Sequence, residues 1–179
     1  MSTVRDIHRG RVVHLTIEEV TLPNGHVMPL EIVRHPGAAA VVAMDEQGNV
    51  TLIRQYRHAV GGYLWEIPAG KLEPDETPLT CATRELAEEV GLQAATLEPI
   101  GSIVTCPGFC DEVIHLFLAT GLSRVPMQRG VDEVIESVSA VPLASALAMI
   151  RTGAIRDSKT IAGLVQTSLR SETAASGSS

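Results

Sequence analysis

An arginine and three glutamates crowd into six positions, in the segment RELAEE at residues 84–89. Carboxylate oxygens are the ligands that Mg²⁺ prefers, and bound Mg²⁺ keeps waters or a substrate phosphate in its remaining positions. A cation site is therefore one interpretation of these acids. The other is a solvent-exposed acidic face with Arg84 as a partial counterion, and the spacing alone does not decide between them.

The acids lie on a predicted helix that spans residues 78–90. Thr77 suits the N-cap, Pro78 suits the first helical position, and Gly91 suits the position just beyond the C-terminus. At about 100° per residue, one narrow sector of this helix is apolar and is expected to pack on a sheet. The sector is formed by Leu79, Ala82, Leu86 and Val90.

The glutamates share another flank of the same helix. Glu85 and Glu89 are roughly 40° apart around the axis and one turn apart along it, and Glu88 lies within about 100° of both. Like charges four residues apart destabilise a helix by about a few tenths of a kcal/mol. We therefore expect a positively charged group or ion to neutralise this flank.

The spacing around this helix resembles a known signature. Gly70 is followed after five residues by Glu76, and after seven more by RELAEEVGL at residues 84–92. This pattern matches every fixed position of the Nudix box, the signature of the Nudix hydrolases. Because the match extends over 23 residues, the resemblance favours a cation site over a solvated face. It implies the family fold, an α/β/α sandwich around a mixed β-sheet flanked by helices.

The rest of the chain independently indicates an α/β protein. Alternating apolar residues over 10–35, interrupted by LPNG, predict an N-terminal antiparallel β-hairpin. The apolar run AAAVVAMD and the following NVTLIRQY predict central strands, and the glycine-rich residues 58–70 predict a loop or short strand. Further strands are predicted over 97–106, 113–122 and 134–143, and helices over 144–153 and 158–170.

The resemblance implies that the glutamates hold Mg²⁺ or Mn²⁺ against a pyrophosphate. By matching positions, Glu85 and Glu89 are the principal metal ligands, and Glu88 is a further ligand or a group that contacts one. Ala69, just before the box glycine, offers its backbone carbonyl to the metal.

Other box residues have supporting roles by the same resemblance. Arg84 resembles the family arginine that orients a glutamate by ion pairing. The resemblance implies that both Arg84 and Glu88 take part in catalysis. Glu76 is expected to be structural. Gly70 and Gly91 are expected to serve backbone turns.

The sequence around the box more narrowly resembles the ADP-ribose pyrophosphatase branch. The segments WEIPAGKLEPDE, IRQYRHAVGG and CPGFCDEVIHLFLA carry this resemblance, and Pro107 lies 15 residues beyond Leu92, where that branch has a proline. The branch implies that Arg57 and Glu112 reach the substrate. Glu73 is a further candidate for a contact on the phosphate side, through metal or water.

Trp65, the sole tryptophan, is a candidate for stacking on the adenine of such a substrate. Packing beside the box is the alternative role for this ring. Tyr56 and Phe109 are other candidates for stacking.

Hydrolysis of a pyrophosphate also requires a group that takes a proton from the attacking water. Branch members carry a glutamate in an acidic loop before a strand, and VDEVIES matches that description at Glu133. Glu133 is therefore expected to be the general base or to position the water. Glu136 and Asp132 remain alternatives, as does a solvent-exposed loop acid with no catalytic role.

Composition excludes several classes of protein. A net charge of −7 and the lack of a basic run argue against a nucleic-acid binder. The sequence has no apolar run long enough to span a membrane and no apolar signal segment, so a cytoplasmic location without membrane association is expected. The three cysteines include Cys106 and Cys110 but no second ligand pair, which favours packing over a zinc site.

The length predicts a single domain over residues 1–170, followed by a disordered tail over residues 171–179. By resemblance to the branch, the hairpin region 1–36 exchanges contacts with a second subunit and helps to build the substrate pocket. A homodimer is therefore expected.

The resemblance implies a metal-dependent hydrolase. It would split the pyrophosphate bond of ADP-ribose, or of a related nucleoside diphosphate sugar, to give AMP and a sugar phosphate. One alternative is hydrolysis of another nucleoside diphosphate derivative. Another is a sensor that binds a nucleotide without cleaving it, but such a module is expected to lose box glutamates, and this chain keeps them all.

Overall fold

The structure is a computed structural model, and it describes residues 4–128, 130 and 133–176 of the 179-residue chain. The chain divides into two compact units. The smaller unit comprises Met1–Gly37 with Val104–Val113, and the larger comprises Ala38–Ile103 with Ile114–Ser179. Within the described residues, no helix is long and apolar enough to cross a membrane.

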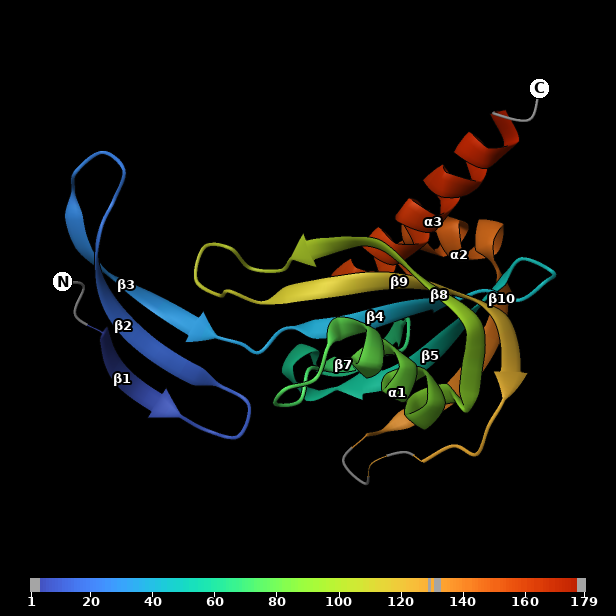
Figure 1. The fold of residues 1–179 in the computed structure, drawn as a ribbon, viewed down its shortest axis with the longest axis horizontal. Coiled ribbons are helices and arrows are strands. Elements are labelled where there is room, and N and C mark those ends of the chain that lie inside the picture. The colour runs from blue at the N-terminus through green and yellow to red at the C-terminus, as the bar shows by residue number, and fades with distance from the viewer. Residues whose placement is uncertain (1–3, 129, 131–132, 177–179) are drawn as a thin grey trace. The chain divides into compact units, whose positions relative to one another are not determined.

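The smaller unit contains a three-stranded antiparallel sheet in the order β1-β2-β3 (Figure 1). Its strands are β1 Val4–Arg9, β2 His14–Thr21 and β3 Val27–Arg34. The predicted hairpin of β2 and β3 is confirmed, and Gly25 in its turn adopts a φ of 84°. The sequence did not reveal β1, because every residue of this edge strand is exposed and leaves no buried alternation.

The larger unit contains the mixed β-structure that the sequence predicts. One sheet has the order β7-β4-β9-β8 and the other has the order β10-β5-β6. Strands β4 and β9 are parallel, whereas β4 with β7, and β5 with both β6 and β10, are antiparallel. The strands are β4 Ala38–Ala43, β5 Asn49–Arg57, β6 Gly62–Glu66, β7 Ala69–Lys71, β8 Leu92–Val104, β9 Val113–Arg124 and β10 Ile135–Pro142. The helices are α1 Pro78–Val90, α2 Leu143–Arg151 and α3 Ser158–Ser176, with a 3₁₀ turn at His58–Val60.

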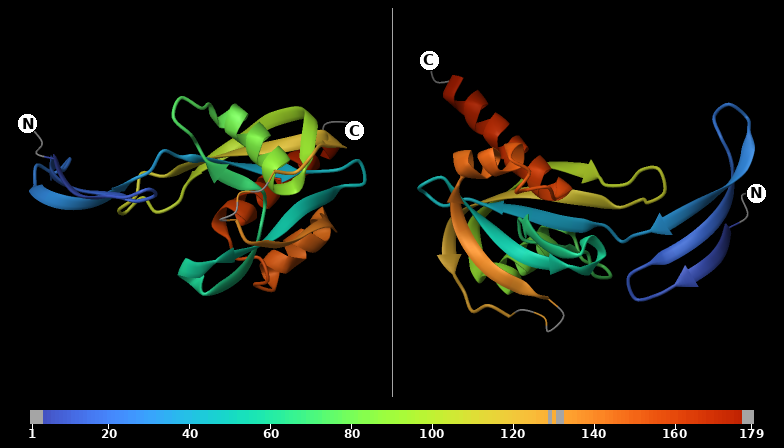
Figure 2. Two further views of the ribbon diagram at one scale, coloured as in Figure 1. Left: turned by 90° about the horizontal axis from the view of Figure 1, so that it is seen from below. Right: turned by 180° about the vertical axis from the view of Figure 1, so that it is seen from behind.

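Helices cover both faces of these sheets. Strand β4 is buried along its whole length, as its continuous apolar sequence predicts. Val41 packs in one cluster with Leu86 of α1. The next residue, Val42, packs in the other cluster with Ala146 of α2 and Leu164 of α3. The left view of Figure 2 shows α1 on one side of the strands and α2 and α3 on the other, which confirms the α/β/α sandwich.

Helix α1 begins and ends where the sequence predicts. Thr77 caps its N-terminus by accepting a hydrogen bond from the Thr80 N–H (3.2 Å), and Gly91 follows its C-terminus with a φ of 65°. The predicted apolar stripe is wrong at Leu79, which is 48% exposed. The buried face instead extends to Cys81 on the acidic flank, because this flank lies against β7 and the Cys81 thiol donates to the Gly70 carbonyl (3.4 Å).

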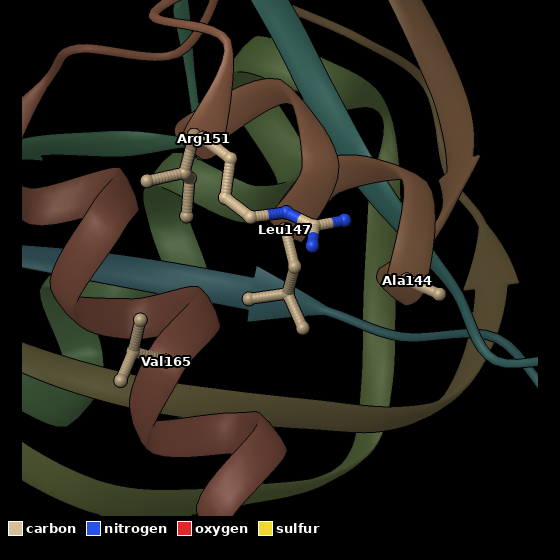
Figure 3. A pocket seen from close by; sticks show the side chains of 5 residues that line it. Ala144, Leu147, Arg151 and Val165 are labelled. Carbon is tan, nitrogen blue, oxygen red and sulfur yellow. The ribbon is translucent and has the colours of Figure 1, made fainter.

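Helices α2 and α3 line an apolar pocket of about 490 Å³ on their side of the sandwich (Figure 3). It is lined by Ala144, Leu147, Ile150, Arg151 and Val165. Its lining residues in the described part of the chain include no carboxylate and none from α1, so this pocket is separate from the acidic flank of α1.

Candidate active site

Three carboxylates converge beside α1. Ligand oxygens of Glu85, Glu89 and Glu133 all lie within 4.8 Å of one another. Helix α1 supplies the first two from successive turns, and Glu133 comes from the segment before β10. Glu85 is 5% exposed and Glu89 is 1% exposed. Anionic groups this close and this buried repel one another unless protons or a cation neutralise them.

The burial of these acids alters how they bind protons. Burial raises the pKa of Glu89 to about 8, and the nearby charges of Glu85 and Glu133 act in the same direction. A hydrogen bond from the Ala69 N–H to Oε2 of Glu89, at 2.9 Å, opposes that rise. Burial also raises the pKa of Glu85, although the neighbouring Arg84 charge opposes it. The raised pKa values of Glu85 and Glu89 mean that binding of a cation would compete with binding of protons at these carboxylates.

Arg84 organises the box loop and the helix together. Its Nε and Nη2 donate to the two carboxylate oxygens of Glu76, each at 2.9 Å, and these bonds lower the pKa of Glu76 to about 2. Its Nη1 donates to Oε1 of Glu85 at 2.6 Å and to Oε2 of Glu88 at 3.2 Å. The Glu88 side chain is 38% exposed. Arg84 thus ties the loop acid Glu76 to two helix glutamates.

Gly70 makes room for one of the converging carboxylates. A Cβ atom at this position would lie 1.7 Å from Oε1 of Glu85, well inside any allowed contact. Gly70 lies in strand β7 and is not among the glycines with positive φ. The expectation that Gly70 serves a backbone turn is therefore wrong, because the requirement is space for Glu85. Gly91 does have the left-handed φ that a turn requires.

The acid cluster fits a divalent cation. Oε2 of Glu133 is buried and accepts no hydrogen bond among the described residues, so it lacks the partner that buried oxygens normally have. The donor set consists of carboxylate oxygens, which suits hard cations such as Mg²⁺ and Mn²⁺. Among the described residues, no other group of three or more potential metal ligands lies this close together. The resemblance of this segment to the Nudix box implies the same class of ion.

Arg57, predicted to reach the substrate, is held by a residue that the sequence analysis did not single out. Its Nε donates to Oε1 of Glu66 at 2.9 Å, and its Nη2 donates to Oε2 at 2.8 Å. Glu66 is 1% exposed, whereas 42% of the Arg57 side chain is exposed. A glutamate inside the apolar segment YLWEIP was the available signal, because a buried strand admits a charge only with a partner.

The alternatives to Glu133 are placed differently. Glu136 forms an ion pair with Arg54 and is not in the acid cluster. Asp132 lies outside the described residues. Of the candidates on this loop, the structure therefore brings Glu133 to the box glutamates.

The remaining predicted residues lie outside the acid cluster. Trp65 is half-buried and packs against the core cluster that contains residues of α2 and α3, whereas the box helix α1 contributes to the other cluster. Glu73 is exposed, and its backbone N–H donates to Oε2 of Glu76 at 3.0 Å. Glu112 belongs to the smaller unit, where its Oε2 accepts from the Thr105 hydroxyl at 2.8 Å. Contacts of these residues with a substrate stay predictions.

The two remaining stacking candidates, unlike Trp65, are exposed rings. Tyr56 is 38% exposed and packs edge-on to Tyr63, with ring centroids 5.4 Å apart. Phe109, in the smaller unit, is 55% exposed.

Known proteins resemble this chain over most of its length. Residues 33–164 match the NUDIX domain family model. A methanol dehydrogenase activator from Bacillus methanolicus is 45% identical over 157 residues, which are 87% of this chain and 84% of that protein. An ADP-ribose pyrophosphatase from Bacillus subtilis (strain 168) is 43% identical over 155 residues, which are 86% of this chain and 84% of that protein. The crystal structure of an ADP compounds hydrolase has the same fold, with a TM-score of 0.82 at 20% identity, covering 96% of this chain and 92% of the other. The chain therefore belongs to the Nudix family.

Proposed function

We propose that this protein hydrolyses the pyrophosphate bond of ADP-ribose or a related nucleoside diphosphate sugar, giving AMP and a sugar phosphate, with Mg²⁺ or Mn²⁺ as the metal ion. The observation that carries the proposal is the convergence of three carboxylates, two of them from buried residues, with no hydrogen-bond partner for Glu133 Oε2 among the described residues. Similarity to an ADP-ribose pyrophosphatase supports the choice of substrate.

Glu85 and Glu89 would hold the cation, with Glu88 beside them and the Ala69 carbonyl as a further ligand. When bound, the cation would neutralise charge on the diphosphate oxygens. Arg84 keeps Glu85 in place through the 2.6 Å bond to its Oε1. The Ala69 N–H keeps Glu89 in place through the 2.9 Å bond to its Oε2. These bonds fix the two carboxylates before any ligand arrives.

Glu133 is the proposed general base. A water oxygen attacks one phosphorus of the diphosphate while Glu133 takes a proton from that water, and the bond from the same phosphorus to the bridging oxygen breaks. The bridging oxygen leaves with the other phosphate. Because Oε2 of Glu133 has no hydrogen-bond partner among the described residues, it is available to accept that proton.

Arg57 would bind the diphosphate, with the opposite edge of its guanidinium held by Glu66. We also propose contacts of Glu73, Glu112 and Trp65 with the substrate, as the resemblance implies. A homodimer and a cytoplasmic location remain proposals of the same kind.

Product analysis tests this function. Purified protein with Mg²⁺ is offered ADP-ribose, other nucleoside diphosphate sugars and nucleoside triphosphates, and products are separated by chromatography. We expect AMP and ribose 5-phosphate from ADP-ribose, or the corresponding pair from a related sugar. Binding of these nucleotides without any product would instead identify a sensor and overturn the proposal.

A further inference from the structure

A second positively charged side chain, Lys159, contacts Glu66, the carboxylate that holds Arg57. Nζ of Lys159 donates to Oε2 of Glu66 at 2.5 Å and to Oδ1 of Asp157 at 3.0 Å. Lys159 is 8% exposed, so it is a buried charge that the proposed reaction does not use directly. The four side chains form a row of alternating charge that runs from the partly exposed Arg57 to the start of α3.

The start of α3 is also fixed to the strand segment that carries Glu66. Oδ2 of Asp157 accepts hydrogen bonds from the Thr160 N–H at 3.0 Å and from its hydroxyl at 2.6 Å. The same Thr160 hydroxyl accepts a hydrogen bond from the Ile67 N–H at 2.9 Å. Because Ile67 directly follows Glu66, these bonds fix Lys159 relative to the carboxylate it contacts.

Glu66 needs this second partner to serve as a rigid anion. Burial acts to raise the pKa of Glu66, but the hydrogen bonds from Arg57 and the charge of Lys159 together lower it, so the carboxylate is ionised at neutral pH. Removal of Lys159 would leave Oε2 with one of its two donors. The Arg57 hydrogen bonds would still hold the carboxylate from one side, but no described residue would hold it from the side of α3.

The orientation of Arg57 depends on that anion. An arginine side chain loses rotamer entropy when it is fixed, and a bidentate partner restricts it in advance of binding. Glu66 uses Nε and Nη2 of Arg57, which leaves the N–H groups of Nη1 for a ligand. Where Glu66 lies therefore determines where Nη1 points.

We propose that Lys159 is a positioning residue: it fixes Glu66, and Glu66 holds Arg57 in the orientation that binds the diphosphate. The inference rests on the proposed function, in which Arg57 contacts the substrate. Lys159 itself touches no reacting atom in this account.

Steady-state kinetics with ADP-ribose and Mg²⁺ test the proposal on the full chain. Lys159→Met keeps the length of the side chain and removes its charge. We expect KM to rise by about tenfold or more, with a smaller change in kcat and an unchanged dependence of the rate on Mg²⁺. Arg156→Met is the matched control, because it removes one positive charge from an exposed position three residues away, and we expect wild-type kinetics.

A double-mutant cycle separates this role from general stability. In an Arg57→Ala background, Lys159→Met should change KM by less than about twofold, because the residue through which it acts is gone. A rise in KM that persists in full in that background would overturn the proposal, as would a folded Lys159→Met variant with wild-type KM. Thermal unfolding of each variant reports whether it is folded.

A second variant covers the case in which Lys159→Met does not fold. If Lys159→Met does not fold, Glu66→Gln replaces it in the same cycle, and it should also raise KM in the wild-type background but not beside Arg57→Ala. Failure of the proposed function has a different signature, since the wild-type protein would then produce no AMP, or Arg57→Ala alone would leave KM unchanged.

Discussion

Replacement of Gly70 by alanine tests the geometry of the proposed metal site with a single methyl group. The new Cβ would lie 1.7 Å from Oε1, 2.1 Å from Cδ and 2.6 Å from Oε2 of Glu85. Non-bonded carbon and oxygen atoms need a little over 3 Å, so the carboxylate must retreat by about 1.5 Å. That movement takes Glu85 out of the 2.6 Å bond from Arg84 and away from Glu89 and Glu133.

The expected loss is large for activity and modest for folding. Misplacement of a catalytic group by about 1 Å costs on the order of 10²-fold in rate, and disturbing the support of a metal ligand costs about 10-fold to 100-fold in metal affinity. Overpacking costs about 1–3 kcal/mol of folding free energy. Gly70 does not have a positive φ, so backbone strain adds nothing to this figure.

The assay is the rate of ADP-ribose hydrolysis as a function of Mg²⁺ concentration, with urea unfolding measured in parallel. Gly62→Ala is the matched control, because a Cβ there meets no atom within 4 Å. We expect Gly70→Ala to need at least about tenfold more Mg²⁺ and to turn over about 10²-fold more slowly at saturation. A Gly70→Ala enzyme with the metal affinity and turnover of the Gly62→Ala control would refute the reasoning.

Three other predictions concern the acid cluster and the helix that carries it. Metal-free protein should lose stability as pH rises from about 4.5 to about 8, because the pKa of Glu89 is raised to about 8 in the folded state and folding therefore favours its protonated form. The expected loss in the free energy of unfolding is on the order of 5 kcal/mol. Urea unfolding at several pH values measures it, and Glu89→Gln should flatten the pH dependence. Glu133→Gln should reduce kcat by orders of magnitude with little change in Mg²⁺ affinity, and a matching loss of affinity in a Mg²⁺ titration would make Glu133 a ligand instead of the base. Thr77→Ala should lower the free energy of unfolding by about 1 kcal/mol with kcat nearly unchanged, because it removes the N-cap of α1, and an unchanged denaturation midpoint would contradict that role.

The parts of the fold that local chemistry determines were predictable from the sequence. Helix α1 has the predicted bounds because Thr77, Pro78 and Gly91 act within a turn of its ends. Strand β4 was predictable because both of its faces are buried and every residue is apolar. The edge strand β1 was not, since none of its residues is buried.

The parts of the site that depend on distant contacts were not predictable in this way. Lys159 and Glu66 are 93 residues apart, and no spacing rule connects them. The reason for glycine at position 70 depends on where the Glu85 side chain lies, and a turn was the simpler expectation. The approach of Glu133 to Glu85 and Glu89 was implied only by resemblance, because the path of a loop between strands cannot be read from its composition.

The central claim is that Glu85 and Glu89, with Glu133 beside them, hold a divalent cation over a diphosphate. The most direct measurement is a crystal structure with Mn²⁺ and a non-hydrolysable methylene analogue of ADP-ribose, in which anomalous scattering locates the ion. The account predicts an anomalous peak bonded to oxygens of Glu85, Glu89 and the analogue. Bound analogue with no peak among these carboxylates would contradict it.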